Sequence, residues 1–160
     1  MQGTFINRFG EEFTVEISDF KIIENKKTGY ERAEKNDWYY FINESGAIEQ
    51  YMEGNTYTDL YMYDNVNYYT NKKLAKNSAR ADHLMRQLRR FAAEHKRKNF
   101  NIKEKYTINY DGNKLYCCDN SFVDKAFGEI YFDSKEITDL AIDAFKDELI
   151  WYFKEYQNTF

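Results

Sequence analysis

Two stretches of the chain carry the same order of strand and turn signals. Residues 40–46 (YFINESG) begin with apolar residues, including Tyr40 and Ile42 two positions apart, and end in a glycine, and residues 106–112 (YTINYDG) repeat this arrangement 66 positions later. Both stretches predict a strand that closes in a tight turn. The junctions where a further strand meets a helix cap also match, with an offset of 63 positions: Tyr69/Asn71 and Phe132/Ser134.

The repeat predicts how the whole chain is organised. Each copy reads as strand, turn, strand, irregular segment, strand and capped helix, over residues 38–98 and 99–160. Two copies are too few for a solenoid, and 160 residues fit one domain. We therefore expect a single α+β domain, residues 1–160, with a mixed, mainly antiparallel sheet and two long helices. Residues 1–37 stand outside the repeat and predict an N-terminal hairpin and a polar loop.

Each copy ends in a segment with helical periodicity. The first helix is expected to begin at a cap formed by Thr70 or Asn71 and to end near Arg97. The second is expected to begin at Asp133, with Glu136 in a capping-box-like position. Apolar residues recur at spacings of three and four on one side of the first helix: Leu74, Ser78, Ala81, Leu84/Met85, Leu88 and Phe91/Ala92. The second helix has the same pattern: Ile137, Leu140/Ala141, Ala144/Phe145, Leu149, Tyr152/Phe153 and Tyr156.

Residues that carry chemistry are sparse. The seven glycines form neither a Walker A run nor a G-x-G-x-x-G fingerprint, and no serine lies in a nucleophile elbow. His83 and His95 lie about 18 Å apart on one predicted helix, which is too far to share a metal ion. The adjacent Cys117 and Cys118 predict reduced strand residues. We therefore expect a protein that is not an enzyme and that has no cofactor and no metal site.

The sequence carries no membrane signal. No stretch approaches the roughly 20 apolar residues of a membrane-spanning helix. The first residues, MQGTFINRFGEEF, lack the apolar core of a signal peptide. We therefore expect a cytoplasmic protein without membrane contact.

Charge is distributed unevenly along the chain. From Lys72 to Lys98 there are ten basic residues and only two acidic ones, Asp82 and Glu94, so this segment carries a net charge of +8. The whole chain carries −4, which leaves −12 for the remainder. The first predicted helix is therefore a basic element in an acidic chain.

Three interpretations of this basic helix remain open. It is a solvated face neutralised by acidic parts of the same chain, a surface that follows a nucleic-acid backbone, or a surface that orients a protein partner while aromatic residues anchor it. The 15 tyrosines favour the third, because many of them are expected to be half exposed. The candidate basic contacts are Arg80, Arg86, Arg89, Arg90, Lys96 and Arg97. The candidate acidic and aromatic contacts are Tyr57, Asp59, Tyr61, Tyr63 and Asp64.

Several runs of residues carry a recognisable pattern: 38–42 (WYYFI), 67–75 (NYYTNKKLA), 88–92 (LRRFA) and 128–136 (GEIYFDSKE). Together they resemble small proteins encoded by phages and prophages of low-GC Gram-positive bacteria. In those proteins an N-Y-F-x-T-K-x-x-A segment leads into a first helix, and an I-Y-F-x-S-x-x-x-A segment leads into a C-terminal one. The resemblance covers about residues 38–156. The chain departs from the pattern at Asn71 and Thr138.

The resemblance implies a biological context. Small acidic phage proteins without a catalytic signature include anti-CRISPR proteins, so the chain resembles an inhibitor of a type II RNA-guided nuclease. Such nucleases have a basic nucleic-acid channel and a mobile nuclease domain. An inhibitor of this kind either blocks nucleic-acid loading or holds the nuclease domain, and its partner is the effector or its guide-RNA complex. The alternative is a phage regulatory or nucleic-acid-binding protein that uses the basic helix 72–98, and a virion-associated structural protein is a third.

Overall fold

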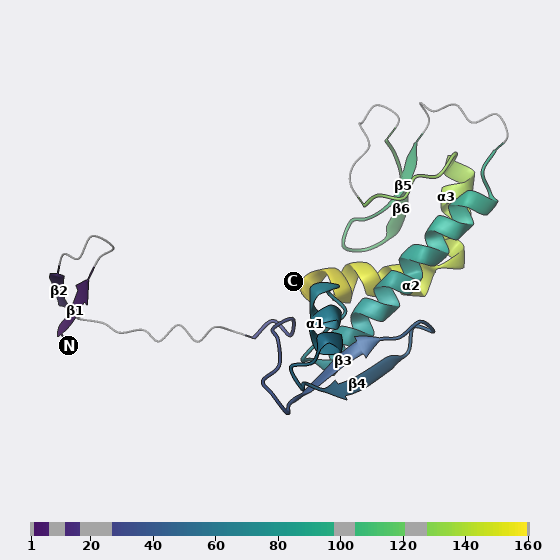
Figure 1. The fold of residues 1–160 in the computed structure, drawn as a ribbon. Helices are drawn as coiled ribbons and strands as arrows, with labels where there is room; N and C mark the ends of the chain where they lie inside the picture. Colours follow the sequence, from purple (N-terminus) through teal and green to yellow (C-terminus); the bar gives the residue numbers. More distant parts are fainter. Residues whose placement is uncertain (1, 7–11, 17–26, 98–104, 121–127, 160) are drawn as a thin grey trace.

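The computed structural model describes residues 2–6, 12–16, 27–97, 105–120 and 128–159. Within these ranges the chain has an α+β fold, as predicted (Figure 1). Strands β1 (Gln2–Ile6) and β2 (Glu12–Glu16) form the expected N-terminal antiparallel hairpin.

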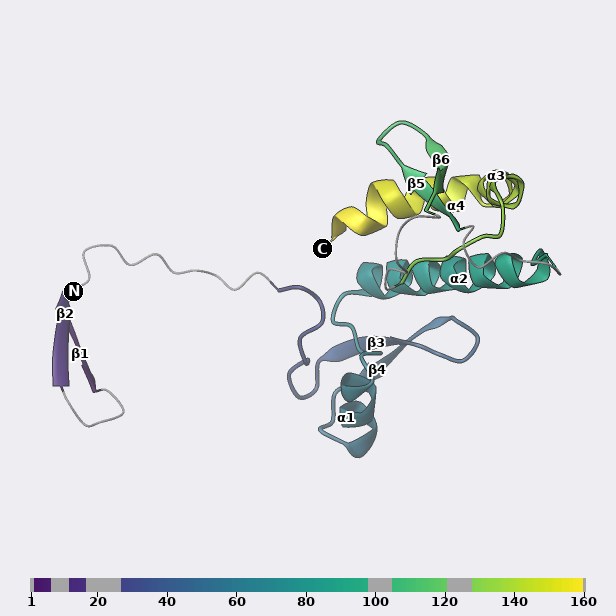
Figure 2. The same cartoon turned by 90° about the horizontal axis from the view of Figure 1, so that it is seen from above.

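The first half of the fold is built in three layers. Strands β3 (Trp38–Ile42) and β4 (Ile48–Met52) pair antiparallel and form the middle layer. Because side chains alternate along a strand, Tyr39 and Phe41 pack to one side and Tyr40 to the other. Helix α1 (Tyr57–Asp64) lies on the Tyr39 side, away from the long helix α2 (Lys72–Glu94), as Figure 2 shows.

Helix α2 connects the two halves. The side chain of Asn71, one of the two predicted caps, accepts hydrogen bonds from the backbone N–H groups of Lys73 and Leu74. The helix ends at Glu94, three residues before the predicted end. Its first turn packs on the β3–β4 hairpin, and its later turns pack on the second half of the chain (Figure 1). The buried residues match the predicted apolar side, and Ala75 joins them: Leu74, Ala75, Ser78, Ala81, Leu84 and Leu88.

The second half begins with another hairpin and ends in a broken helix. Strands β5 (Tyr106–Tyr110) and β6 (Leu115–Asp119) pair antiparallel. The helical elements that follow are α3 (Lys135–Ala144), α4 (Lys146–Trp151), a π-helical turn η1 (Tyr152–Tyr156) and a 3₁₀ turn η2 (Gln157–Thr159). The expected second long helix is therefore interrupted at Phe145, which caps α3 at its C-terminus and precedes α4.

The cap of α3 differs from the prediction. Ser134 is the N-cap, and its hydroxyl accepts a hydrogen bond from the N–H of Ile137. Asp133, the predicted cap, instead accepts a hydrogen bond of 2.9 Å from the backbone N–H of Arg97. Asp133 thus links the end of α2 to the start of α3.

Matching backbone bridges join each hairpin to the segment before the next helix. Tyr40 and Tyr69 exchange two backbone hydrogen bonds of 2.8 and 2.9 Å, and Tyr106 and Phe132 exchange two of 3.1 and 2.9 Å. Both are isolated bridges rather than strands, because a helix N-cap follows two residues later in each case. Strand pairing among the described residues is therefore limited to three separate two-stranded antiparallel sheets, in place of the expected larger mixed sheet.

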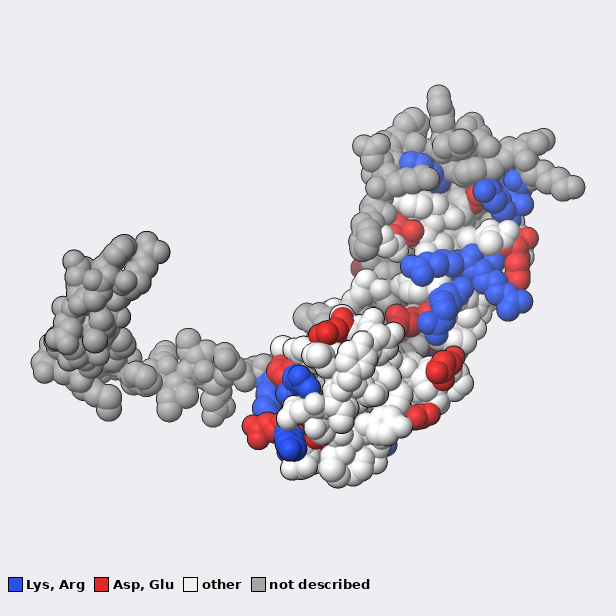
Figure 3. All heavy atoms as spheres, in the orientation of Figure 1, with Lys and Arg blue, Asp and Glu red and all other residues white. Residues whose placement is uncertain are grey.

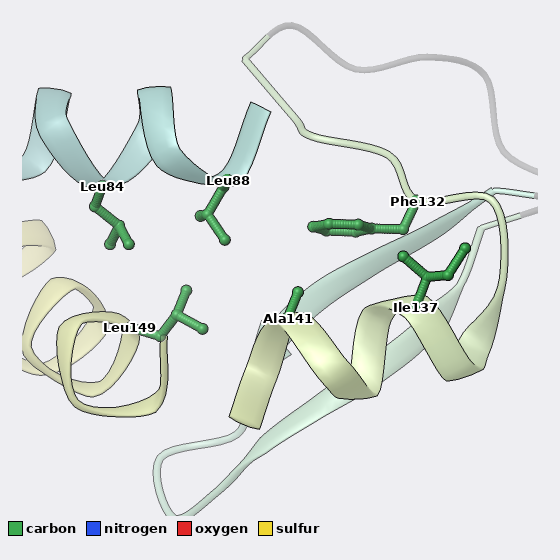
Figure 4. Packing of buried hydrophobic residues seen from close by; sticks show 6 residues of the cluster. All are labelled: Leu84, Leu88, Phe132, Ile137, Ala141 and Leu149. Carbon is green, nitrogen blue, oxygen red and sulfur yellow. The ribbon is translucent and has the colours of Figure 1, made fainter. Parts of the chain in front are cut away.

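The largest apolar cluster lies where α2 meets the second half (Figure 4). Its members come from α2, the segment before α3, α3 itself and α4, and each is at most 8% exposed: Leu84, Leu88, Phe132, Ile137, Ala141 and Leu149. Burying a large apolar side chain contributes about 1.5–3 kcal/mol. This cluster therefore holds α2 in place.

Candidate functional site

Two carboxylates are buried at the start of α1, one within its first turn and one just before it. Asp59 is 4% exposed, and its Oδ2 accepts hydrogen bonds from the N–H of Gly54 (3.0 Å) and from the N–H and hydroxyl of Thr56 (both 2.8 Å). Its Oδ1 accepts a hydrogen bond of 2.9 Å from the hydroxyl of Tyr39. Because Thr56 is the N-cap of α1 and Asp59 is the third residue of its first turn, the pair forms a capping box.

Glu53 is the second buried carboxylate, with none of its surface exposed. Arg32 donates two hydrogen bonds to it, from Nε to Oε2 (3.2 Å) and from a terminal nitrogen to Oε1 (3.0 Å). The hydroxyl of Tyr68 donates to Oε2 at 2.7 Å, and the N–H of Asn55 donates to Oε1 at 2.7 Å. Both oxygens of Glu53 are therefore fully paired.

These contacts fix the ionisation of the cluster. Burial alone raises the pKa of Asp59, but the hydrogen bonds from Thr56, Gly54 and Tyr39 outweigh it and lower this pKa to about 2. The hydrogen bonds from Arg32 lower the pKa of Glu53 in the same sense. For the two phenols, burial and the adjacent carboxylates raise the pKa of Tyr39 and of Tyr68. The carboxylates are thus ionised and the phenols neutral at neutral pH.

The buried cluster positions structure rather than reactants. Every carboxylate oxygen already accepts at least one hydrogen bond, and the rings of Tyr39 and Tyr68 stack with centroids 4.0 Å apart. Ionised carboxylates that are buried and have lowered pKa values are poorly suited to act as a general acid or base. The cluster instead ties residues 53–56 and the first turn of α1 to the β3–β4 hairpin.

As a result, helix α1 has reversed polarity in the sense that it buries a charged residue and exposes large apolar ones. Its one fully buried residue is the aspartate Asp59, and Met62 packs against the Tyr39 cluster, whereas Tyr57, Leu60 and Tyr61 face solvent. Tyr57 is 82% exposed, Tyr61 56% and Leu60 41%. Their spacing of three and four places them on one side of the helix. We call Tyr57, Leu60, Tyr61 and the exposed Asp64 the α1 face.

The five acidic and aromatic residues expected to contact a partner have three different surroundings. Tyr57, Tyr61 and Asp64 belong to the α1 face. Tyr63 is 39% exposed and packs edge-on against Tyr68, with ring centroids 5.5 Å apart. The expectation that Asp59 is a surface contact is wrong, because the capping box and Tyr39 enclose its carboxylate.

The segment that carries the α1 face, residues 38–71, lacks positive charge of its own. Residues 38–71 contain no lysine and no arginine, but they contain five acidic residues. Two of these five are the buried Glu53 and Asp59, and the others are exposed: Glu44, Glu49 and Asp64. Three further large apolar side chains of this segment are about half exposed: Trp38, Tyr51 and Met52. The first half of the fold therefore presents an aromatic surface with a negative charge.

Two of the basic residues predicted to contact a partner instead form ion pairs within the chain. Arg80 makes a bidentate ion pair with Glu148 (2.7 and 3.0 Å), and its guanidinium carbon lies 3.9 Å from the ring centroid of Trp151. Arg97 makes an ion pair with Glu136 at 3.2 Å. These arginines link α2 to α4 and to α3.

The other basic residues are at the surface, and Figure 3 shows Lys and Arg gathered over α2. Arg90 makes an ion pair with Glu94 one turn further along the helix (2.7 Å). Arg86 and Arg89 are exposed and have no ion pair with any described residue. Lys96 is exposed just beyond the helix end. The basic surface that can contact a partner therefore has fewer residues than the sequence predicted, because Arg80 and Arg97 form ion pairs within the chain.

The described residues hold no group of three or more His, Cys, Asp and Glu side chains suited to a metal ion. Cys117 and Cys118 are unpaired and half-buried in β6, and burial raises the pKa of the Cys117 thiol. No helix in the described ranges has the length and apolar character needed to cross a bilayer.

Comparison of this chain with protein-family models, with curated proteins and with solved structures finds no match. Function is therefore inferred from the surfaces described above and from their charge.

Sequence reasoning missed α1 and the buried carboxylates beneath it. The sequence predicted an irregular segment between the second and third strands of the first copy, where the structure has α1. The signal that identifies the helix start is the capping-box sequence Thr56-Tyr57-Thr58-Asp59.

Proposed function

We propose that this chain is a non-catalytic binding protein of the bacterial cytoplasm that inhibits a host defence nuclease stoichiometrically. The observation that carries the proposal is the reversed polarity of α1. A helix that buries an ionised aspartate and exposes two tyrosines and a leucine gains nothing from that exposure in the isolated chain. Such an arrangement is typical of a surface that is covered by a partner.

The exposed aromatic side chains on one side of the first half supply much of the area that a binding surface needs. On α1 and on the Phe41 side of the β3–β4 hairpin, four of them are between 39% and 82% exposed: Tyr51, Tyr57, Tyr61 and Tyr63. At about 200 Å² for each fully exposed ring, they present roughly 450 Å². A standard interface buries about 800 Å² per partner. Tyrosine and tryptophan are also the residue types that most often anchor such interfaces.

Charge identifies the kind of partner. With no basic residue in 38–71 and with Glu44, Glu49 and Asp64 exposed, this surface complements a positively charged one. A nuclease channel that holds nucleic acid is such a surface. The resemblance to phage-encoded proteins supports an RNA-guided nuclease of type II as the host enzyme, with the α1 face occupying its basic channel or holding its mobile nuclease domain.

The test is a cleavage assay with a purified type II effector, its guide RNA and a matching DNA target. We expect a one-to-one complex by size-exclusion chromatography and loss of cleavage at equimolar inhibitor. The double variant Tyr57→Ala/Tyr61→Ala should bind at least about 30-fold more weakly, because truncation of an anchoring tyrosine costs about 2 kcal/mol or more.

The matched control is Tyr116→Ala/Leu140→Ala, which removes two exposed apolar side chains from the second half of the fold. This variant should inhibit like the wild type. Absence of a complex together with undiminished cleavage across type II effectors would show that the nuclease assignment is wrong. Equal losses in both double variants would show that the α1 face is not the binding surface.

A further inference from the structure

A row of basic residues runs along the solvent side of α2. Successive members are separated alternately by four and three residues, a spacing that keeps side chains on one side of a helix. The row within the helix is Lys72, Lys76, Ala79, His83, Arg86, Arg90 and Ala93. All are exposed except the half-buried Ala79. No acidic residue belongs to the row, and its two non-basic members are alanines.

The permanent charges of the row are four: Lys72, Lys76, Arg86 and Arg90. Lys76 and Arg86 make no ion pair with any described residue. Arg90 has only the exposed Glu94 as a partner, and Lys72 lies 5.8 Å from the ring centroid of Tyr40. The charges of the row are therefore open to an external anion, unlike those of Arg80 and Arg97.

We propose that this basic row binds the phosphate backbone of a single-stranded nucleic acid. This site is separate from the α1 face, because α1 lies on the far side of the β3–β4 hairpin from α2 (Figure 2). The proposal does not depend on the proposed nuclease.

The shape of the row selects a single strand. From Lys72 to Arg90 it extends about 27 Å, at 1.5 Å per residue. A flexible strand follows a straight row over its whole length. In a duplex the phosphates wind around the helix axis, so only a few of them meet the row. The alanines leave room for the backbone to approach the helix closely.

Fluorescence anisotropy with a labelled oligothymidylate of about twelve nucleotides tests the proposal. Four phosphate contacts predict a slope of about −2.8 in log affinity against log salt, because each contact in a single strand contributes about −0.7. Between about 50 and 200 mM KCl, the affinity should fall about 50-fold. The double variant Arg86→Ala/Arg90→Ala should bind roughly tenfold more weakly at low salt. Its affinity should then fall only about sevenfold over the same range, since two contacts remain.

The control is Lys73→Ala/Lys146→Ala, which removes two exposed charges outside the row and changes the net charge equally. It should retain the wild-type slope, and circular dichroism should show the same melting temperature for all variants. Three results would each overturn the proposal: no binding at low salt, an equal loss in the control, or tighter binding of a duplex of the same length. The Tyr57→Ala/Tyr61→Ala variant should bind the oligonucleotide like the wild type. The proposal for the α1 face and the proposal for the basic row can therefore be disproved separately.

Discussion

Replacing Asp59 by asparagine should destabilise the protein by about 2–3 kcal/mol. An amide presents one acceptor where the carboxylate presents two. If its oxygen keeps the N–H groups of Gly54 and Thr56, the hydroxyl of the fully buried Tyr39 loses its acceptor. A hydrogen bond to a charged group is worth about 1.5–3 kcal/mol, and a buried unsatisfied group costs about 1–3 kcal/mol. The pKa of Asp59, which these same hydrogen bonds lower from 3.8 to about 2, corresponds to about 2 kcal/mol.

The pH dependence of unfolding separates this charge effect from simple loss of packing. The folded-state pKa of Asp59 lies below its unfolded value, so the unfolded state binds the proton more tightly. The stabilisation is therefore fully present above about pH 4, and it is lost as the pH falls towards 2. In Asp59→Asn this contribution is missing, so the free energy of unfolding should decline less between pH 4 and 2 than in the wild type.

Urea titrations followed by tryptophan fluorescence at several pH values measure both effects. Asp64→Asn is the matched control, because it makes the same chemical change at an exposed position of the same helix. This control should keep both the stability at pH 7 and the wild-type pH slope. The reasoning is refuted if Asp59→Asn unfolds within about 0.5 kcal/mol of the wild type at pH 7. It is also refuted if the variant retains the full pH dependence.

Two other predictions concern the hairpin glycines and Arg80. Gly46→Ala and Gly112→Ala should each lower the free energy of unfolding by about 1 kcal/mol in urea titrations. Both glycines have positive φ (+85° and +94°) with open space around them, so backbone strain alone should account for the loss. Arg80→Ala should cost about 1 kcal/mol and alter the fluorescence of Trp151, because the guanidinium that stacks on this ring and pairs with the half-exposed Glu148 is removed. Unchanged stability and emission in this variant would contradict the contact.

The features that sequence periodicity predicted correctly are those set by local rules. The buried side of α2, its cap at Asn71 and the strands around Gly46 and Gly112 all follow from residue spacing and turn chemistry. The isolated β-bridges at Tyr69 and Phe132 occur at the predicted junctions between a strand and a helix cap, although neither bridge extends into a strand.

The features that sequence reasoning missed depend on contacts between distant residues. Asp59 looked like a surface charge because nothing in its neighbourhood shows that the hydroxyl of Tyr39, 20 residues away, donates to it. Arg80 looked like a free charge until the fold brought Glu148, 68 residues away, within 2.7 Å. The choice of Ser134 over Asp133 as a cap likewise depends on Arg97, whose N–H occupies the aspartate.

The position of α2 between the two halves has a consequence for how the chain folds. The helix follows the first hairpin in sequence, but Leu84 and Leu88 complete the apolar cluster of the second half. At its other end, Leu74 and Ala75 complete the cluster beneath β3–β4. Each half needs this one helix to complete one of its apolar clusters, so melting of α2 exposes both of these clusters together. The two halves should therefore unfold as one cooperative unit, and a break between them would separate fragments that recover structure only by associating again.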